Sequence, residues 1–332
     1  MLLHIKFMKA LNFFKFIGRG LKCMQFKGNN SLISLSGHDN YVQLITIENP
    51  YEVMAEVKKI ALLIFPDLDF CQIERVFGDI LKLFHGRYPG YRRCNTAYHD
   101  INHTMDCFLV MAKLIHGAVV DRINFTKKDV SLGLISALMH DTGYIQTVSE
   151  NNGTGGKYTL CHIERSIEFM EKYFQDNQFP AEWLSICRNF LKCTGLDVRV
   201  AEIEFDSREH EILGQMLGAA DLIGQMADKH YLEKLHFLYS EFKEGGVPGY
   251  MDETDLLQKT PGFWEMVKQR FVSELGQVDL FLRHHFRARH GIDQDLYRVA
   301  IDRNIERLQF LLHYRKSDRR NDPVGCWQGG LI

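Results

Sequence analysis

Apolar residues recur at steps of three and four along most of this 332-residue chain. After Pro50, for example, Val53, Val57 and Ile60 would lie on one face of a helix that Pro66 would end. The same spacing predicts further helices over residues 70–86, 102–117, 127–141, 161–175, 180–193, 207–229, 230–243, 261–286 and 293–315. The N-caps predicted for three of these helices are Asp129, Ser207 and Asp293. The pattern therefore predicts an all-α protein.

The N-terminal residues follow a different pattern. Basic and apolar side chains alternate over residues 1–28, which is typical of an amphipathic helix on a membrane surface. An alternative is that translation begins at Met24, which would leave the first residues as an unstructured extension. Over residues 31–48, β-branched and polar residues alternate around a turn-like segment at 37–40, and this favours a β-hairpin or an extended arm.

Two glycine-rich segments interrupt the helical pattern. Residues 151–156 predict a mobile loop, and not a P-loop, because no buried strand leads into it and no Lys-Ser/Thr pair closes it. Residues 245–262 predict a second long loop. The domain organisation expected from these patterns is an N-terminal extension over 1–50, a helical domain over 51–316 and a flexible tail over 317–332.

The composition excludes several classes of protein. Charged residues make up 25% and hydrophobic residues 45%, as in an ordinary globular domain, and a net charge of −2 argues against a nucleic acid duplex as partner. No apolar run approaches the roughly 20 residues of a membrane span. The eight cysteines show no CxxC spacing, which favours reduced thiols and a cytoplasmic location. Membrane contact is expected only through residues 1–28, and oligomer formation is left open.

Histidines and aspartates occur at three points in apolar, helix-like contexts. The first is Tyr98-His99-Asp100-Ile101-Asn102-His103, the second is His140-Asp141, and the third is Asp221, 80 residues later. An unpaired charge in such a context is costly. Imidazoles and carboxylates are ligands of divalent cations, so a metal would explain all three points together.

The spacing of these residues indicates how they could share one site. His99 and His103 are one helical turn apart, whereas the side chains of His140 and Asp141 would diverge by about 100° on a regular helix. Asp141 could bridge two metal ions if the doublet lies at a helix end, where Gly143 lets the chain break. Two imidazoles and two carboxylates leave coordination positions open, which is typical of a catalytic site.

The order His…His-Asp…Asp resembles the HD-domain metal-dependent phosphohydrolase superfamily, and within it the class I 3′,5′-cyclic-nucleotide phosphodiesterases. Residues 98–103 are similar to their Tyr-His-Asn-x-x-His element. Leu191-Lys192-Cys193-Thr194 is similar to their Leu-Ala-Thr-Asp segment, and Ala219-Ala220-Asp221-Leu222 to their Cys-Ala-Asp-Leu segment. The resemblance covers about residues 60–240 and implies an HD-domain helical bundle.

The resemblance also implies roles for individual residues. His103, His140, Asp141 and Asp221 would ligate a first metal ion, and Asp141 would bridge to a second ion otherwise held by water. A hydroxide between the two ions would be the nucleophile. His99 would be the general acid that protonates the leaving ribose oxygen. The implied cofactors are two divalent ions, of Zn, Mn, Mg or Fe.

The chain departs from the family pattern at several positions. Tyr144 stands where the phosphodiesterases have a histidine followed by Pro-Gly, so we expect the second metal or the phosphate to be contacted differently there. His162 lies about where HD proteins supply another histidine, as a metal ligand or phosphate contact. Gln269 and Gln277 are candidates for purine recognition by position alone.

Other polar residues near these motifs have ordinary explanations. Asp106 is expected on a solvated helix face, with a hydrogen bond to a metal ligand as the alternative. Asp228 could orient His99. Residues 92–93, both arginines, could meet phosphate but are expected in a solvated loop. The histidines and arginines of residues 283–290 predict a basic surface patch.

The function expected from the sequence is hydrolysis of a cyclic-nucleotide phosphodiester by a metal-dependent phosphohydrolase. One alternative is the same chemistry on another nucleotide: a nucleoside monophosphate, a cyclic dinucleotide or a guanosine polyphosphate. The absence of a Gly-Tyr-Pro sequence near the His-Asp pair disfavours the cyclic dinucleotide. The other alternative is a catalytically silent nucleotide-binding regulatory protein.

Overall fold

A computed structural model describes residues 44–321 of the chain, and the side chains of residues 44–314. This part consists of α-helices and short 3₁₀ turns, with no β-strand beyond one isolated bridge between Tyr91 and Thr147. The all-α prediction is therefore confirmed. The expectations for residues 1–43, including the amphipathic helix and most of the hairpin, lie outside the described residues. The helices below belong to one compact unit within residues 45–332.

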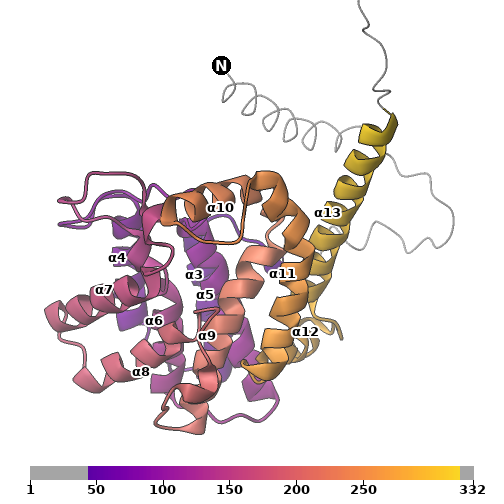
Figure 1. The fold of residues 1–332 in the computed structure, drawn as a ribbon. Helices are drawn as coiled ribbons and strands as arrows, with labels where there is room; N and C mark the ends of the chain where they lie inside the picture. Colours follow the sequence, from indigo (N-terminus) through magenta and orange to yellow (C-terminus); the bar gives the residue numbers. More distant parts are fainter. Residues whose placement is uncertain (1–43, 322–332) are drawn as a thin grey trace, which may run out of the picture. The chain divides into compact units, whose positions relative to one another are not determined.

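The helices follow one another closely along the chain (Figure 1). The α-helices are α3 Pro50–Ile64, α4 Cys71–Phe84, α5 Ile101–Val120, α6 Lys127–Met139, α7 His162–Asp176, α8 Ala181–Lys192, α9 Arg208–Ala227, α10 Tyr231–Gly245, α11 Glu253–Ser273, α12 Phe281–His290 and α13 Leu296–Asn321. The 3₁₀ turns are η1 Thr142–Tyr144, η2 Gly155–Tyr158, η3 Val200–Glu202 and η4 Val278–Leu280. Most of the predicted helices are present within a few residues of their expected ends.

The region after α10 differs most from the prediction. The helix expected over 261–286 is two helices, α11 and α12, and the loop expected over 245–262 ends at Asp252, which caps α11. Pro261 lies inside α11, because Leu256 and Leu257 are buried and their packing holds the preceding turns in place. Tertiary contacts thus outweigh the local signal of the proline.

Several predicted helix ends also move. Thr126, and not Asp129, is the N-cap of α6, while Asp129 completes a capping box from the third helical position. Before α13, Asp295 replaces Asp293 as the residue that accepts the first backbone N–H groups. Ser207 is confirmed as the N-cap of α9. α13 continues past residue 317, where a flexible tail was expected.

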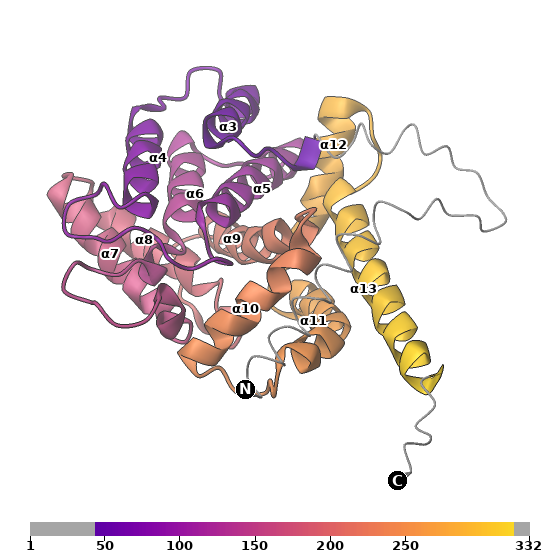
Figure 2. The ribbon, with the colours of Figure 1, turned by 90° about the horizontal axis from the view of Figure 1, so that it is seen from above.

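α5 is the central helix of this unit. It is long and apolar enough to cross a membrane, but 83% of its apolar window is buried inside the protein, as in a core helix. The helices α3, α6, α9 and α12 pack around it (Figure 2). Gly117 permits the closest approach, since a Cβ there would lie 1.8 Å from the backbone oxygen of Phe281. The N-terminal end of α5 is thereby brought against the end of α6 and the middle of α9.

Candidate metal centre

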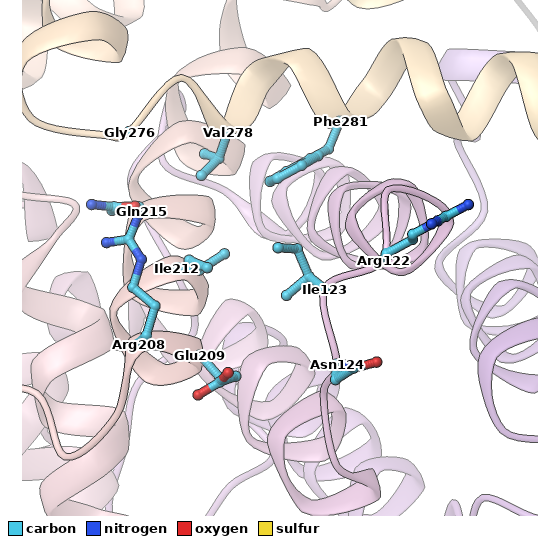
Figure 3. Close-up of a pocket in the computed structure, with 10 residues that line it drawn as sticks. All are labelled: Arg122, Ile123, Asn124, Arg208, Glu209, Ile212, Gln215, Gly276, Val278 and Phe281. Atoms are coloured by element: carbon cyan, nitrogen blue, oxygen red, sulfur yellow. The ribbon is translucent and has the colours of Figure 1, made fainter.

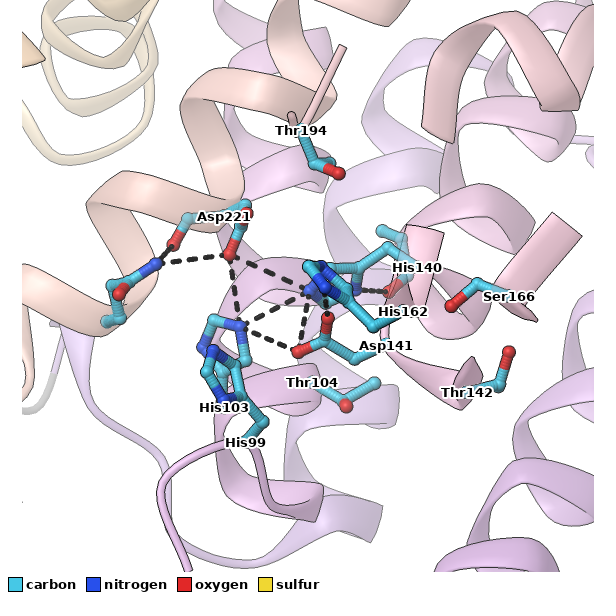
Figure 4. A network of polar contacts seen from close by, with 12 residues as sticks. His99, His103, Thr104, His140, Asp141, Thr142, His162, Ser166, Thr194 and Asp221 are labelled. Carbon is cyan, nitrogen blue, oxygen red and sulfur yellow. Dashed lines mark hydrogen bonds and ion pairs between the residues drawn. The ribbon is translucent and has the colours of Figure 1, made fainter. Parts of the chain in front are cut away.

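Three helices bring the predicted ligands together at one buried point (Figure 4). His103 lies in the first turn of α5, where the side chain of the N-cap Asp100 accepts its backbone N–H. His140 is the C-cap of α6, and Asp141 follows as the chain enters η1. Asp221 projects from α9. The expected helix end at the His-Asp doublet is confirmed, and it lets both adjacent side chains face the same point.

The distances between the ligand atoms are short. Nε2 of His103 lies 3.1 Å from Oδ2 of Asp141 and 3.1 Å from Oδ1 of Asp221. Nε2 of His140 lies 3.3 Å from Nε2 of His103 and 3.3 Å from Oδ2 of Asp141. The other ring nitrogen of His140 lies 2.9 Å from the carbonyl oxygen of Ala137, which leaves Nε2 as the atom that faces the cluster.

The cluster has the properties of a cation site. His103, His140 and Asp141 are at most 3% exposed, and their candidate ligand atoms lie within 4.8 Å of one another. Oδ2 of Asp141 is close to both imidazoles, yet it makes no hydrogen bond of acceptable geometry. Two lone-pair nitrogens and a carboxylate oxygen that converge in this way are suited to bind a divalent ion.

The electrostatics of the cluster favour positive charge. Burial opposes the charged form of His103, but the nearby carboxylates of Asp141 and Asp221, each 3.1 Å away, raise its pKa to about 10. Burial would raise the pKa of Asp141, but His140 and His103 hold that pKa well below its usual range. The two carboxylates therefore attract protons to the imidazoles, and a divalent ion would take the place of those protons.

Gly143 fixes the segment that follows the His-Asp pair. A Cβ at this position would lie 1.9 Å from the backbone oxygen of His162, and its N–H donates to the hydroxyl of Ser166 at 2.8 Å. The lack of a side chain at Gly143 and this hydrogen bond together allow η1 to lie directly against the first turns of α7. The break expected at Gly143 is therefore a close helix approach and not a flexible point.

Three aromatic rings form a stack beside the cluster. The ring of Tyr144 stacks on both His99 and His162, with ring centroids 4.3 Å and 4.6 Å away, and the two imidazole centroids are 6.3 Å apart. Nε2 of His162 is 3.9 Å from Oδ1 of Asp141, the oxygen that faces away from His103 and His140. The structure thus brings His99, Tyr144 and His162 to the same site as the four predicted ligands.

Glu241 is the site residue that the sequence analysis missed. Its Oε2 lies 2.6 Å from Nδ1 of His99, and its Oε1 accepts the backbone N–H groups of Ala97 and Tyr98. The suggestion that Asp228 orients His99 is wrong, because both oxygens of Asp228 are bound elsewhere, by Lys234 and by a backbone N–H. No local signal marks Glu241, since it lies in a helix rich in charged residues.

The outcomes for the remaining candidates vary. Asp106 is half-buried, and not on the solvated face expected for it; burial, with a smaller effect of Asp228, raises its pKa to about 8. The basic surface patch is confirmed only in part. Arg283 and Arg287 are exposed, but His285 is fully buried against His116, and Arg289 pairs with Glu56.

The candidates for contact with phosphate or purine are exposed. Residues 92–93, Gln269 and Gln277 all lie on the solvent-facing surface.

The segment Leu191–Thr194 closes α8, where the hydroxyl of Thr194 donates to the carbonyl of Leu191. Arg270 donates to the carbonyl oxygens of Cys193 and Gly195 and so fixes that helix end.

A larger cavity, of about 300 Å³, contains none of the predicted ligands (Figure 3). It is lined by Arg122, Ile123, Asn124, Arg208, Glu209, Ile212, Gln215, Gly276, Val278 and Phe281. A smaller cavity, of about 10 Å³, is lined in part by His103 and Asp106.

Comparison with known proteins gives one partial similarity. Residues 149–285 match the model of the Npun_R2479-like family. The matched segment includes His162, Asp221 and Glu241, but not the part of the chain that carries His99, His103 and the His-Asp pair. No match is found among curated proteins.

Proposed function

We propose that this protein is an HD-type metal-dependent phosphohydrolase that hydrolyses a nucleotide phosphodiester. The observation that carries the proposal is the convergence on Nε2 of His103, which lies 3.1 Å from carboxylate oxygens of both Asp141 and Asp221 and 3.3 Å from Nε2 of His140. Four ligands from distant parts of the chain meet in a buried place, where such polar groups would be costly without a cation.

The metal would be held by His103, His140, Asp141 and Asp221, with His162 beside the far oxygen of Asp141. Divalent ions in such a site stabilise the negative charge on a phosphoryl oxygen and lower the pKa of bound water. The mixed nitrogen and oxygen ligand set is compatible with Zn, Mn, Fe or Mg. The cyclic nucleotide as substrate rests on the sequence resemblance.

His99 is the proton donor in this proposal. Glu241 binds its Nδ1, so Nε2 is the ring nitrogen that faces away from the carboxylate and can transfer a proton to the leaving oxygen. Stacking on Tyr144 restricts rotation of the imidazole. Tyr144 stands at the position where the phosphodiesterase pattern has a histidine. The phosphate would therefore be contacted differently at this position.

The test is hydrolysis of cyclic AMP and cyclic GMP by the purified full chain with added Mn²⁺ or Mg²⁺. We expect turnover that Asp141→Asn abolishes and that His210→Gln retains. His210 is the matched control, since it is a largely buried histidine 3.2 Å from a carboxylate, that of Asp129, outside the cluster.

Each result leads to a different conclusion. Turnover that survives Asp141→Asn would reject this cluster as the active site. Bound metal without turnover on either substrate would reject the cyclic-nucleotide assignment and direct the search to other nucleotides. Neither metal nor turnover would favour the silent nucleotide-binding protein.

A further inference from the structure

The second ring nitrogen of His103 has no hydrogen-bond partner among the described residues. Nε2 faces the cluster, while Nδ1 is buried on the opposite side of the ring. A histidine that binds a cation through Nε2 carries its proton on Nδ1. A buried N–H without an acceptor costs about 1–3 kcal/mol, so a histidine held in this way needs an acceptor close to Nδ1.

The cavity of about 10 Å³ beside His103 is the place where an acceptor can act. Its size corresponds to about one water molecule, which in a protein makes about three hydrogen bonds. The side chains that line it are all polar: Tyr98, His103, Asp106, Gln225, Asp228 and Lys234. A water molecule here could bridge His103 and Asp106, and two polar partners are the fewest that a buried water needs.

Most of these polar groups are already engaged. The Tyr98 hydroxyl donates to Oε1 of Gln225, whose Nε2 donates in turn to Oδ1 of Asp221. One oxygen of Asp228 accepts from Lys234 and the other accepts the backbone N–H of His230. Lys234 is a donor only. These groups do not supply the acceptor that Nδ1 of His103 requires.

Asp106 is the remaining acceptor. It follows His103 by three positions in α5, so the two side chains lie on the same face of the helix, one turn apart. Its carboxylate makes no hydrogen bond to the described residues. Asp106 is half-buried where α9 packs closely at Gly224, since a Cβ there would lie 3.3 Å from the Cβ of Asp106.

We propose that Asp106 is a positioning residue for His103, whose Nδ1 proton it accepts through one water molecule in the small cavity. The accepting carboxyl oxygen of Asp106 fixes the rotation and the tautomer of the imidazole, so that the lone pair of Nε2 faces the cation. It also makes that nitrogen a stronger ligand. This inference rests on the proposed metal centre.

The first test measures the affinity of the full chain for Zn²⁺ by competition with a chelator. Loss of a hydrogen-bond partner of a ligating histidine typically weakens binding about 10–100-fold, and we expect this for Asp106→Leu. Asp106→Asn keeps the shape and one acceptor oxygen, so we expect a smaller loss. Asp129→Asn is the matched control, because it changes a buried carboxylate beside His210 and should leave Zn²⁺ affinity unchanged.

The second test observes the Nδ1–H proton of His103 by NMR, in the metal-free and the Zn²⁺-loaded protein. We expect a slowly exchanging signal in the wild type that Asp106→Leu shifts or removes and Asp129→Asn preserves. Asp106→Asn provides the same comparison if the leucine variant does not fold.

The outcomes separate this inference from the proposed function. If the wild type binds Zn²⁺ and both Asp106 variants match its affinity and its Nδ1–H signal, Asp106 has no positioning role. If the wild type binds no metal, the metal centre itself fails. An Nδ1–H signal that still depends on Asp106 would then show the contact to be structural only.

Discussion

Glu241 and His99 lie 142 positions apart in the sequence, yet Oε2 of the glutamate is 2.6 Å from Nδ1 of the histidine. The other oxygen of the same carboxylate accepts the backbone N–H groups of Ala97 and Tyr98. Glu241, in α10, therefore holds both the turn that leads into α5 and the imidazole of His99. A carboxylate that is 5% exposed needs these donors to offset its loss of hydration.

If His99 is the general acid, Glu241→Gln should lower kcat about 10–100-fold. General acid catalysis contributes about 10²–10⁴-fold in all, and this change would remove part of that contribution. The amide presents one acceptor where the carboxylate has two, so it cannot hold both the ring and the backbone N–H groups. The check is a double-mutant cycle with His99→Ala, in which the second change should add little. Glu244→Gln, one turn later, is the control, because Glu244 binds Thr154 instead. Additive losses would contradict the coupling.

A divalent cation should stabilise the folded protein. A ligand present at 100 times its Kd adds about 2.7 kcal/mol to the free energy of unfolding, which thermal unfolding with and without Zn²⁺ or Mn²⁺ can measure. We expect Asp221→Ala to abolish this gain and His210→Gln to retain it. An equal gain in Asp221→Ala would place the bound ion elsewhere.

The affinity for that cation should rise with pH. The pKa of His103 is raised to about 10, because the nearby carboxylates of Asp141 and Asp221 outweigh the effect of burial. A cation that binds at pH 7 must therefore displace a proton, and fewer protons need to leave as the pH approaches 10. Calorimetry in two buffers of different ionisation enthalpy measures the protons released. Binding that releases none would contradict this arrangement.

Gly143→Ala should destabilise the protein by about 3 kcal/mol or more. The added Cβ would lie 1.9 Å from the backbone oxygen of His162, and neither η1 nor α7 can move without disturbing the other. Gly78→Ala is the matched control, since nothing lies within 4 Å of its Cβ and it sits inside α4. That change should stabilise the protein by about 0.5–1 kcal/mol. Denaturant unfolding measures the free energy of unfolding of both variants. An alanine at 143 that leaves this free energy unchanged would show that η1 is not held against α7.

Acidification should destabilise the protein through His285. Burial, with the charges of Lys113 and His116, lowers the pKa of this fully buried imidazole, so it stays neutral in the folded chain and takes up a proton on unfolding. Stability is therefore full above the unfolded-state pKa of about 6.5 and falls below it, by about 2 kcal/mol at pH 5. The free energy of unfolding from pH 8 to 5 should fall less steeply in His285→Leu. Equal slopes would rule His285 out as the cause.

Much of the fold follows from local pattern. The three- and four-residue spacing gave the helices from α3 to α10 because each has an apolar face that must be buried, whatever its neighbours are. The prediction failed between 245 and 293, where α11 and α12 replace the loop expected over 245–262 and the single helix expected over 261–286. The buried Leu256 and Leu257 keep that segment helical, and residue spacing alone does not show which side chains are buried.

The residues of the candidate site also include some that the sequence indicates and some that it does not. His103, His140, Asp141 and Asp221 could be selected from the sequence, because polar residues in apolar helices are costly unless they are paired. Glu241 could not, because a carboxylate in a helix is ordinary on a solvated surface and unusual only once it is buried.

The sequence by itself determined the helical class of the protein and the types of residue available to bind a cation, since both depend on spacing and side-chain chemistry along the chain. Only the tertiary structure decided which groups complete the site. The contact of Glu241 with His99, the stacking of Tyr144 on two histidines and the small cavity beside His103 each depend on how distant helices pack. Packing fixes distances between residues far apart in the chain, and those distances decide which polar groups lose their water and must bind one another.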